Sequence, residues 1–193
     1  GGLKGFSTDA NAKASGGKGL GTIPHALICT YKGDTVAASV AFDKYIDPSI
    51  ARIALVDFDN DCVNTSLAVA RKLGRKLAGV RLDTSANMVD KSVINPNGME
   101  SPTGVCKELV WNVRRALDKE GFDYVKIIVS SGFNPERIKA FEAEGVPVDT
   151  YAVGSFFFDG NINFTADIVM VDGKPCAKEG RKYMPNPKLE DVD

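Results

Sequence analysis

Residues 50–83 read IARIALVDFDNDCVNTSLAVARKLGRKLAGVRLD, and this stretch decides the fold class. It opens with an apolar run at 50–58 and closes with a second one at 77–83. Between them, residues 60–74 have the pattern of a helix that ends in Lys and Arg followed by Gly74. The two runs are apolar almost throughout, which is typical of parallel strands covered on both faces. The stretch therefore predicts a strand–helix–strand unit.

The same alternation of short apolar runs and helical patterns continues along the chain. Further strands are predicted at 25–31, 124–131, 148–155 and 166–173, and further helices at 34–46, 102–120 and 134–145. Asp34 and Asn134 are candidate N-caps, and Gly121 is expected to end the helix before it. The repetition predicts an α/β fold with a parallel sheet, but periodicity alone does not separate an open sheet from a barrel.

Two segments break this alternation. Residues 1–20 are rich in Gly, Ser, Lys and Ala without periodicity and are predicted to be loop. Residues 84–104 form a long polar insert directly after a strand, where such a loop is usually functional or mobile. We therefore expect a loop-rich segment at 1–24, an α/β domain at 25–173 and a C-terminal tail at 174–193.

Composition argues against two classes of partner, nucleic acids and membranes. The chain has 193 residues, 44% of them hydrophobic and 25% charged, with a net charge of −1, so no basic footprint for nucleic acid is present. No apolar run approaches the roughly 18 residues that span a bilayer, and no signal peptide precedes the first strand, so no membrane partner is expected. The chain has four cysteines, Cys29, Cys62, Cys106 and Cys176, each more than thirty residues from the next. This spacing disfavours a structural zinc site and suits a reduced, cytoplasmic compartment.

Polar residues gather where the predicted strands end, which is where parallel α/β proteins bind ligands. One strand ends in three acids (Asp57, Asp59, Asp61), the next ends in Arg81 and Asp83, and two others end in the small-residue turns SSG (130–132) and VGS (153–155). Gly/Ser turns can hold a phosphate on backbone N–H groups, carboxylates suit Mg²⁺ or ribose hydroxyls, and arginine can clamp an acid. Together they favour a phosphorylated sugar, a metal and an acidic co-substrate.

Each of these residues also has a structural interpretation. Asp59 and Asp61 are placed to cap the following helix, and Arg81 with Asp83 could form an ordinary ion pair. The only histidine, His25, lies between Pro24 and an apolar run, where a histidine is most often structural.

Seven short motifs, in order, resemble the nicotinate phosphoribosyltransferase family, specifically its barrel half: GTIPHALI, GDT, ALVDF, GVRLDT, VKIIVSSGFN, YAVGS and GKPCAKEGRKYMPNP. The resemblance implies an incomplete (β/α) barrel of the type II phosphoribosyltransferase kind, with parallel strands and outer helices. It implies transfer of phosphoribose from phosphoribosyl diphosphate (PRPP) to nicotinate, which gives nicotinate mononucleotide and diphosphate in NAD biosynthesis, with ATP as co-substrate and Mg²⁺ as cofactor.

The resemblance also assigns residues. His25 matches the histidine that ATP phosphorylates, Arg81 a residue beside nicotinate and PRPP, Asp83 a carboxylate at the ribose or metal, and Asp57 a second acid near the diphosphate. Mg²⁺ would be held through Asp57 and Asp83. The two turns that match the 5′-phosphate site consist of Ser130, Ser131, Gly132, Gly154 and Ser155.

The sequence departs from the family pattern at two points. Many members have Ser-Gly-Asp after the RLD motif, whereas here Thr84 is followed by Ser85 and Ala86. The family's N-terminal α+β region, which helps to close the site in an oligomer, is expected to be missing or to be a separate chain, so the chain alone is expected to be inactive. The alternatives are a non-catalytic phosphate-binding or assembly module, and a nicotinamide or quinolinate phosphoribosyltransferase. His25 argues against the quinolinate enzymes, which do without ATP.

Overall fold

Four parallel strands form the central sheet, in the spatial order β1–β2–β3–β4. They are β1 (Arg52–Leu55), β2 (Leu77–Leu82), β3 (Lys126–Val129) and β4 (Thr150–Tyr151). The computed structural model describes residues 5–14, 16, 19–93, 102–157 and 166–188. The α/β fold with parallel strands is confirmed, and within the described residues the sheet is open and does not close into a barrel.

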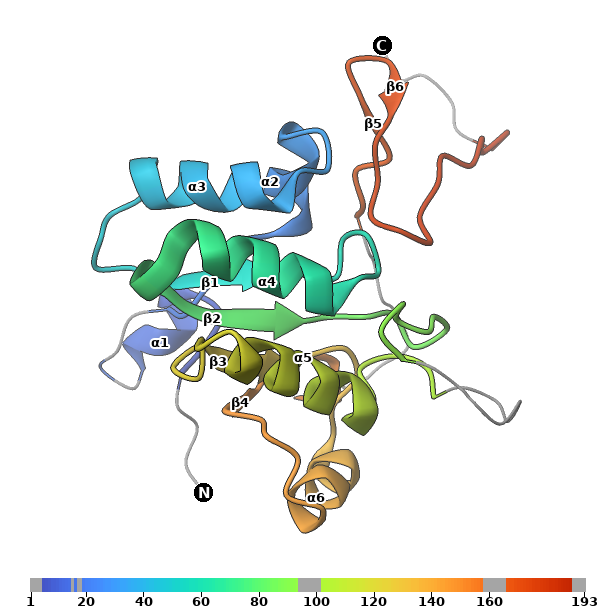
Figure 1. Cartoon of the computed structure of the whole chain (residues 1–193). Helices are drawn as coiled ribbons and strands as arrows, with labels where there is room; N and C mark the ends of the chain where they lie inside the picture. The colour runs from blue at the N-terminus through green and yellow to red at the C-terminus, as the bar shows by residue number, and fades with distance from the viewer. Residues whose placement is uncertain (1–4, 15, 17–18, 94–101, 158–165, 189–193) are drawn as a thin grey trace.

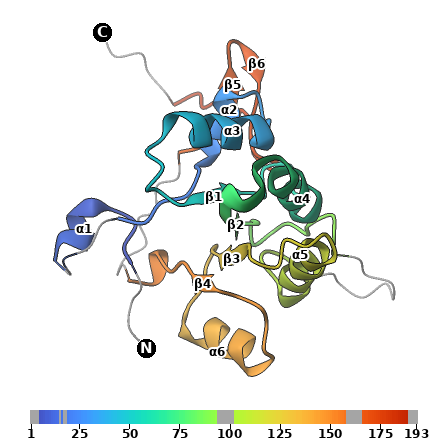
Figure 2. The same cartoon turned by 60° about the vertical axis from the view of Figure 1, so that its left-hand side comes forward.

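Three helices cover one face of this sheet, as Figures 1 and 2 show. They are α3 (Thr35–Tyr45), α4 (Cys62–Leu73) and α5 (Lys107–Lys119), and each lies next to the following one in the chain. The predicted caps are present, because the side chains of Asp34 and Asp61 each accept a backbone hydrogen bond from the first turn of their helix. The apolar face of α5 is fully buried at Leu109, Val113 and Leu117.

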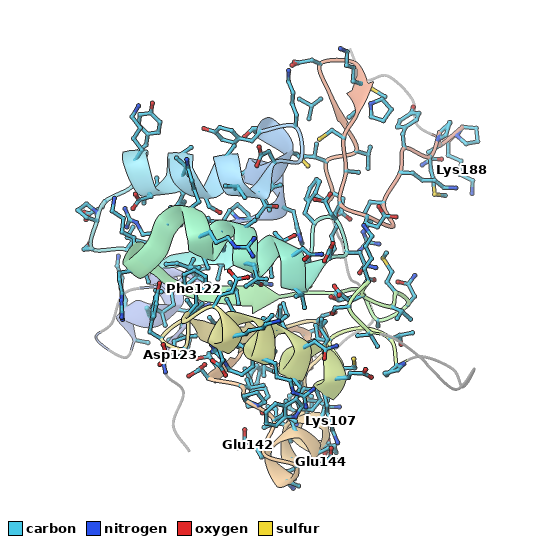
Figure 3. The ribbon with its side chains drawn as sticks, viewed as in Figure 1. Lys107, Phe122, Asp123, Glu142, Glu144 and Lys188 are labelled. Carbon is cyan, nitrogen blue, oxygen red and sulfur yellow. The ribbon has the colours of Figure 1, made fainter. Side chains whose placement is uncertain are left out.

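The last helix of the domain, α6 (Pro135–Ala143), follows β3 and is capped by Asn134 as predicted. It is tied to the start of α5, since Lys107 pairs with Glu144 just after α6 (Figure 3). Helix α5 begins later than expected from its sequence pattern. Gly104 has a φ of +69° and Cys106 is the N-cap, so the helix starts at Lys107 and not at residue 102.

The predicted strand at 25–31 is wrong. These residues form a helix, α2 (His25–Thr30), and the extended backbone of Pro24 starts it. The carbonyl of Pro24 accepts hydrogen bonds from the backbone N–H groups of Leu27 (3.1 Å) and Ile28 (3.4 Å). A short apolar run fits a buried helix as well as a strand. Here the hydrogen bonds to the carbonyl of Pro24 favour the helix.

The predicted strand at 166–173 is mostly wrong as well. Only β5 (Met170–Val171) is extended, and it pairs antiparallel with β6 (Lys174–Pro175) and not with the central sheet. Asp172 and Gly173 connect them with φ values of +50° and +72°. An Asp-Gly pair with two positive φ angles is the preferred two-residue hairpin turn, so the chain returns on itself before it can join the parallel sheet.

Three smaller elements complete the fold. Helix α1 (Asp9–Lys13), capped by Thr8, lies within the segment that the sequence predicts to be loop. Two short 3₁₀ turns, η1 (Gly74–Lys76) and η2 (Ser155–Phe157), follow α4 and β4. The first half of the polar insert is held by buried Asp90, which accepts hydrogen bonds from the backbone of Cys62 and from Ser92. Residues 94–101 of the insert lie outside the described residues.

Tight strand packing at Gly79 gives a first testable prediction. A Cβ at this position of β2 would lie 2.8 Å from Ile128 Cδ1 and 3.0 Å from the backbone oxygen of Lys126 in β3. Gly79→Ala is therefore expected to lower the free energy of unfolding by about 1–3 kcal/mol, as overpacking does. Gly21→Ala is the control, because nothing lies within 4 Å of its Cβ position. Urea unfolding of both variants checks this, and equal stabilities would contradict the packing of β2 on β3.

Candidate functional site

The carboxyl ends of the strands, the start of α2 and the C-terminal segment meet at one edge of the sheet. In Figure 1 the arrow of β2 points toward the loop after it and toward the side of the molecule that carries the hairpin β5–β6. The described part of the C-terminal segment (166–188) reaches the domain body here, since Glu179 N donates to Phe58 O at 2.7 Å. This edge brings together residues that are distant in the sequence.

His25, the first residue of α2, forms a pair with Asp57, which lies just after β1. Its Nε2 is 2.9 Å from Asp57 Oδ1, and the His25 side chain is 21% exposed while that of Asp57 is fully buried. A carboxylate only accepts hydrogen bonds, so we assign the ring proton to Nε2, which donates to Asp57. The lone pair of a neutral His25 is then on Nδ1.

Lys178 joins the same pair from the C-terminal segment. Its ammonium group forms an ion pair with Asp57 Oδ2 and donates to the backbone oxygen of Asp83 at 2.8 Å. The residue is 8% exposed. Lys178 therefore compensates the buried charge of Asp57 and ties the C-terminal segment to the ends of two neighbouring strands.

The carboxyl group of Asp57 stays ionised despite its burial. Burial alone would raise the pKa of Asp57, but the hydrogen bond from His25 and the positive charge of Lys178 outweigh it, so the pKa lies below its ordinary value. The site therefore holds a carboxylate between two groups that stabilise its negative charge.

Arg81, near the end of β2, organises a second network beside the first. Its Nε donates to Ser130 Oγ at 2.9 Å, and its two terminal nitrogens donate to Thr22 Oγ1 at 3.1 Å and to Asp83 Oδ1 at 3.3 Å. Ser130, after β3, also donates to Asp83. The ion pair of Arg81 and Asp83 that the spacing allowed is present, and both side chains are partly exposed.

The two networks are adjacent. One ligand-type atom from each of His25, Asp57 and Asp83 lies within 4.8 Å of the others. Lys178 contacts both acids, through the side chain of Asp57 and the backbone of Asp83. A cavity of about 220 Å³ lies beside His25, between α2 and the C-terminal segment; its lining residues are Pro24, His25, Ala26, Cys29, Ala166, Asp167, Ile168 and Lys178.

The structure places both small-residue turns at the same edge of the sheet. Ser131 and Gly132 follow β3 and both have a φ of +74°. Arg137 of α6 holds this turn by donating to Ser131 O at 2.8 Å and to Val105 O at 2.7 Å. Gly154 and Ser155 follow β4, the neighbour of β3, and are exposed.

Two acids near the end of β1 do not join the cluster, and Lys178 joins it although its sequence pattern does not predict this. Asp61 caps α4, as its structural interpretation predicts, and Asp59 is exposed. Lys178 was not singled out, because a lone lysine in an apparent tail gives no signal by itself. Its presence within the motif GKPCAKEGRKYMPNP was the one indication.

The chain is 27% identical to the nicotinate phosphoribosyltransferase of Bacillus subtilis (strain 168) over 79% of the length of this chain. Its fold matches the crystal structure of nicotinate-nucleotide pyrophosphorylase from Pyrococcus furiosus with a TM-score of 0.65 and 37% sequence identity over 94% of this chain. The resemblance to nicotinate phosphoribosyltransferases is confirmed.

The extent of these similarities is limited. This chain spans 28% of the Bacillus phosphoribosyltransferase and 42% of the Pyrococcus chain. No protein-family model matches it. Among the described residues, no helix is both long and apolar enough to cross a membrane.

The lowered pKa of Asp57 gives a second prediction. A carboxyl whose pKa is lower in the folded state contributes stability above its unfolded pKa of about 3.9, and this stability is lost as pH falls through the folded pKa. The stability difference between the wild type and Asp57→Asn is therefore expected to be largest at neutral pH and to shrink below about pH 4. Urea unfolding across this range checks it. Asp123→Asn, at an exposed position labelled in Figure 3, is the control. A difference that does not change with pH would contradict the assignment.

Proposed function

We propose that this chain is the barrel part of a nicotinate phosphoribosyltransferase. It transfers the 5-phosphoribosyl group from PRPP to nicotinate, giving nicotinate mononucleotide and diphosphate, and couples this transfer to ATP hydrolysis. The observation that carries the proposal is the contact of His25 with buried Asp57, beside the network of Arg81, Asp83 and Ser130 at the ends of the strands. The names of the two similar proteins support it.

The transfer step needs positioning and charge stabilisation more than acid–base catalysis. The bond from C1′ of the ribose to the diphosphate oxygen breaks, and the pyridine nitrogen of nicotinate forms a new bond to C1′. Positive charge develops on the ribose ring, and the partly exposed carboxylate of Asp83 stabilises it. Arg81 binds an anionic group of the substrates, and its links to Asp83 and Ser130 orient the guanidinium.

The 5′-phosphate is assigned to the turns after β3 and β4. The turn at Ser131 and Gly132 directly precedes the N-terminus of α6, where backbone N–H groups and the helix dipole favour an anion. Gly154 and Ser155 follow the neighbouring strand and would contact the phosphate from the other side.

His25 is assigned as the acceptor of the ATP γ-phosphoryl group. The bond between the γ-phosphorus and the bridging oxygen of ATP breaks, Nδ1 bonds to phosphorus and ADP leaves. The proton on Nε2 stays in its hydrogen bond with Asp57, whose carboxylate stabilises the positive charge of the phosphorylated ring. Lys178 offsets the added negative charge near Asp57.

Mg²⁺, which the resemblance implies, fits Asp83 better than Asp57. Both carboxylate oxygens of Asp57 are engaged by His25 and Lys178. Asp83 lies at the open edge, and its side chain is 23% exposed. Arg81 and Ser130 both donate to its Oδ1. Mg²⁺ prefers one or two carboxylates together with water and substrate phosphates. Bound there, the ion would neutralise charge on the diphosphate of PRPP.

The test of the proposal uses the single histidine of the chain. Incubation with Mg²⁺ and ATP labelled in the γ-phosphate is expected to give acid-labile, base-stable label on the protein, and His25→Ala is expected to lose it completely. Because no other histidine is present, any phosphohistidine is at His25. Absence of label, in a chain whose fold is verified by circular dichroism, would contradict ATP coupling.

A second candidate is a phosphoribosyltransferase that uses nicotinamide or quinolinate. The name of the Pyrococcus protein specifies the nucleotide and not the acceptor base, which keeps this candidate open. Product formation from PRPP with each of the three acceptors, with and without ATP, separates the candidates. Formation of mononucleotide from nicotinate that increases with ATP supports a nicotinate phosphoribosyltransferase. ATP-independent use of quinolinate supports a quinolinate phosphoribosyltransferase.

A further inference from the structure

Two cysteines that are 147 positions apart in sequence meet beside the site. Cys29 lies on α2, four residues after His25, and Cys176 directly follows β6 in the C-terminal segment. The thiol of Cys176 donates to the backbone oxygen of Cys29 at 3.7 Å, and the thiol of Cys29 is 4.0 Å from the backbone oxygen of Cys176. These reciprocal contacts place the two residues side by side.

The two thiols differ in their surroundings. Cys29 is 2% exposed and lines the cavity beside His25, while Cys176 is only partly buried. Burial, then the neighbouring thiol of Cys176 and the charge of Asp167, raise the pKa of Cys29 to about 11. Cys29 is therefore protonated at neutral pH, and Cys176 is the thiol that a reagent in solution reaches first.

The remaining two cysteines lie elsewhere in the fold. Cys62 is fully buried at the start of α4, with its thiol 3.7 Å from Thr84 Oγ1. Cys106 is the N-cap of α5, and its sulfur accepts a hydrogen bond from the backbone of Leu109. Cys29 and Cys176 are thus the pair that the fold brings into mutual contact among the described residues.

We propose that Cys29 and Cys176 are a reversible disulfide site that fastens the C-terminal segment to α2. The oxidant is a low-molecular-weight disulfide of the glutathione class. This proposal does not depend on the proposed function, because it follows from the reciprocal contacts of the two cysteines.

The exchange proceeds in two balanced steps. The thiolate of Cys176 attacks one sulfur of oxidised glutathione, the glutathione disulfide bond breaks, and one glutathione thiolate leaves. Cys29 then loses its proton and attacks Cys176 Sγ in the mixed disulfide, and the second glutathione thiolate leaves. Two protein thiols are oxidised to one disulfide, and one glutathione disulfide is reduced to two thiols.

The bond would act directly on the site. Lys178 is two residues after Cys176 and holds the charge of Asp57. Glu179 N donates to Phe58 O, so the segment after Cys176 is attached to the body through a few polar contacts. A disulfide between Cys29 and Cys176 would prevent this segment from leaving α2 and would keep Lys178 beside Asp57.

Redox titration of the full chain in glutathione buffers tests the proposal. After acid quenching and alkylation, oxidation is expected to lower the number of free thiols from four to two, and peptide mapping is expected to show one link between Cys29 and Cys176. Reduction by dithiothreitol should reverse it. The oxidised form is expected to unfold at a temperature several degrees higher and to be cleaved more slowly within residues 177–188, because the link constrains the unfolded chain and the segment.

Two matched variants separate this pair from the other cysteines. Cys176→Ser is expected to abolish the intramolecular link, and Cys106→Ser is expected to retain it. Three results would overturn the proposal: a stable glutathione adduct at Cys176, a link that involves Cys62 or Cys106, or four free thiols under conditions that oxidise the urea-unfolded chain.

Discussion

Lys178→Met is expected to destabilise the protein by about 3–5 kcal/mol, the cost of leaving a buried charge without its partner. The side chain of Asp57 is completely buried, and that of Lys178 is 9% exposed. Methionine fills a similar volume but removes the ammonium group, so Asp57 loses the contact at Oδ2 and keeps only the hydrogen bond from His25. Urea unfolding at pH 7 measures the loss.

A double variant distinguishes lost charge compensation from lost packing. In Asp57→Asn/Lys178→Met neither charge is present, and we expect it to recover more than half of the stability that Lys178→Met loses. Lys182→Met, at an exposed position of the same segment, is expected to change stability by less than about 0.5 kcal/mol. A Lys178→Met protein as stable as this control would mean that the ion pair with Asp57 is absent.

Arg81→Ala is expected to weaken the binding of PRPP by about 10- to 100-fold, which corresponds to the loss of one or two charge-assisted hydrogen bonds. Arg81→Lys is expected to lose nearly as much, because a lysine cannot reproduce the fork that contacts Ser130, Thr22 and Asp83 together. Isothermal titration calorimetry with Mg²⁺ and PRPP measures the change.

The control for this prediction is Arg75→Ala. Arg75 is exposed in η1, before β2, and its guanidinium lies 4.4 Å from the ring centroid of Tyr124. It is therefore at the opposite end of the strand from Arg81, and its loss is expected to leave the binding of PRPP unchanged. Equal affinities of the Arg81 and Arg75 variants would remove Arg81 from the proposed site.

The parts of the fold that the sequence predicts are those that local chemistry determines. The helices α3, α4 and α6 begin after the expected caps, and the strands β1 to β3 lie within the predicted strands 50–58, 77–83 and 124–131. The run 25–31 forms a helix although its pattern predicts a strand, because it is too short for its periodicity to separate the two. The run 166–173 does not join the central sheet because the Asp172-Gly173 turn at its end, and not its composition, makes β5 pair with β6.

The candidate site likewise contains contacts that the sequence predicts and contacts that it does not. Asp57, Asp83 and Ser130 follow strands and Arg81 lies near the carboxyl end of β2, so their approach to one edge could be predicted from parallel pairing alone. The contacts of Lys178 with Asp57, and of Cys176 with Cys29, could not be predicted. They depend on where the C-terminal segment returns to the domain, which no local pattern encodes.

The central claim is that the ends of the strands form a phosphoribosyl site, and a thermal-shift titration tests it most directly. The chain is titrated with Mg²⁺ and PRPP and, separately, with nicotinate mononucleotide, with ribose 5-phosphate and sulfate as controls. A ligand at about 100 times its dissociation constant stabilises the folded state by roughly 2.7 kcal/mol, which gives a readily measured shift. We predict a saturable rise in melting temperature with PRPP and the mononucleotide, larger than with either control and reduced in Arg81→Ala. A cooperatively folded chain that PRPP stabilises no more than sulfate does would contradict the account.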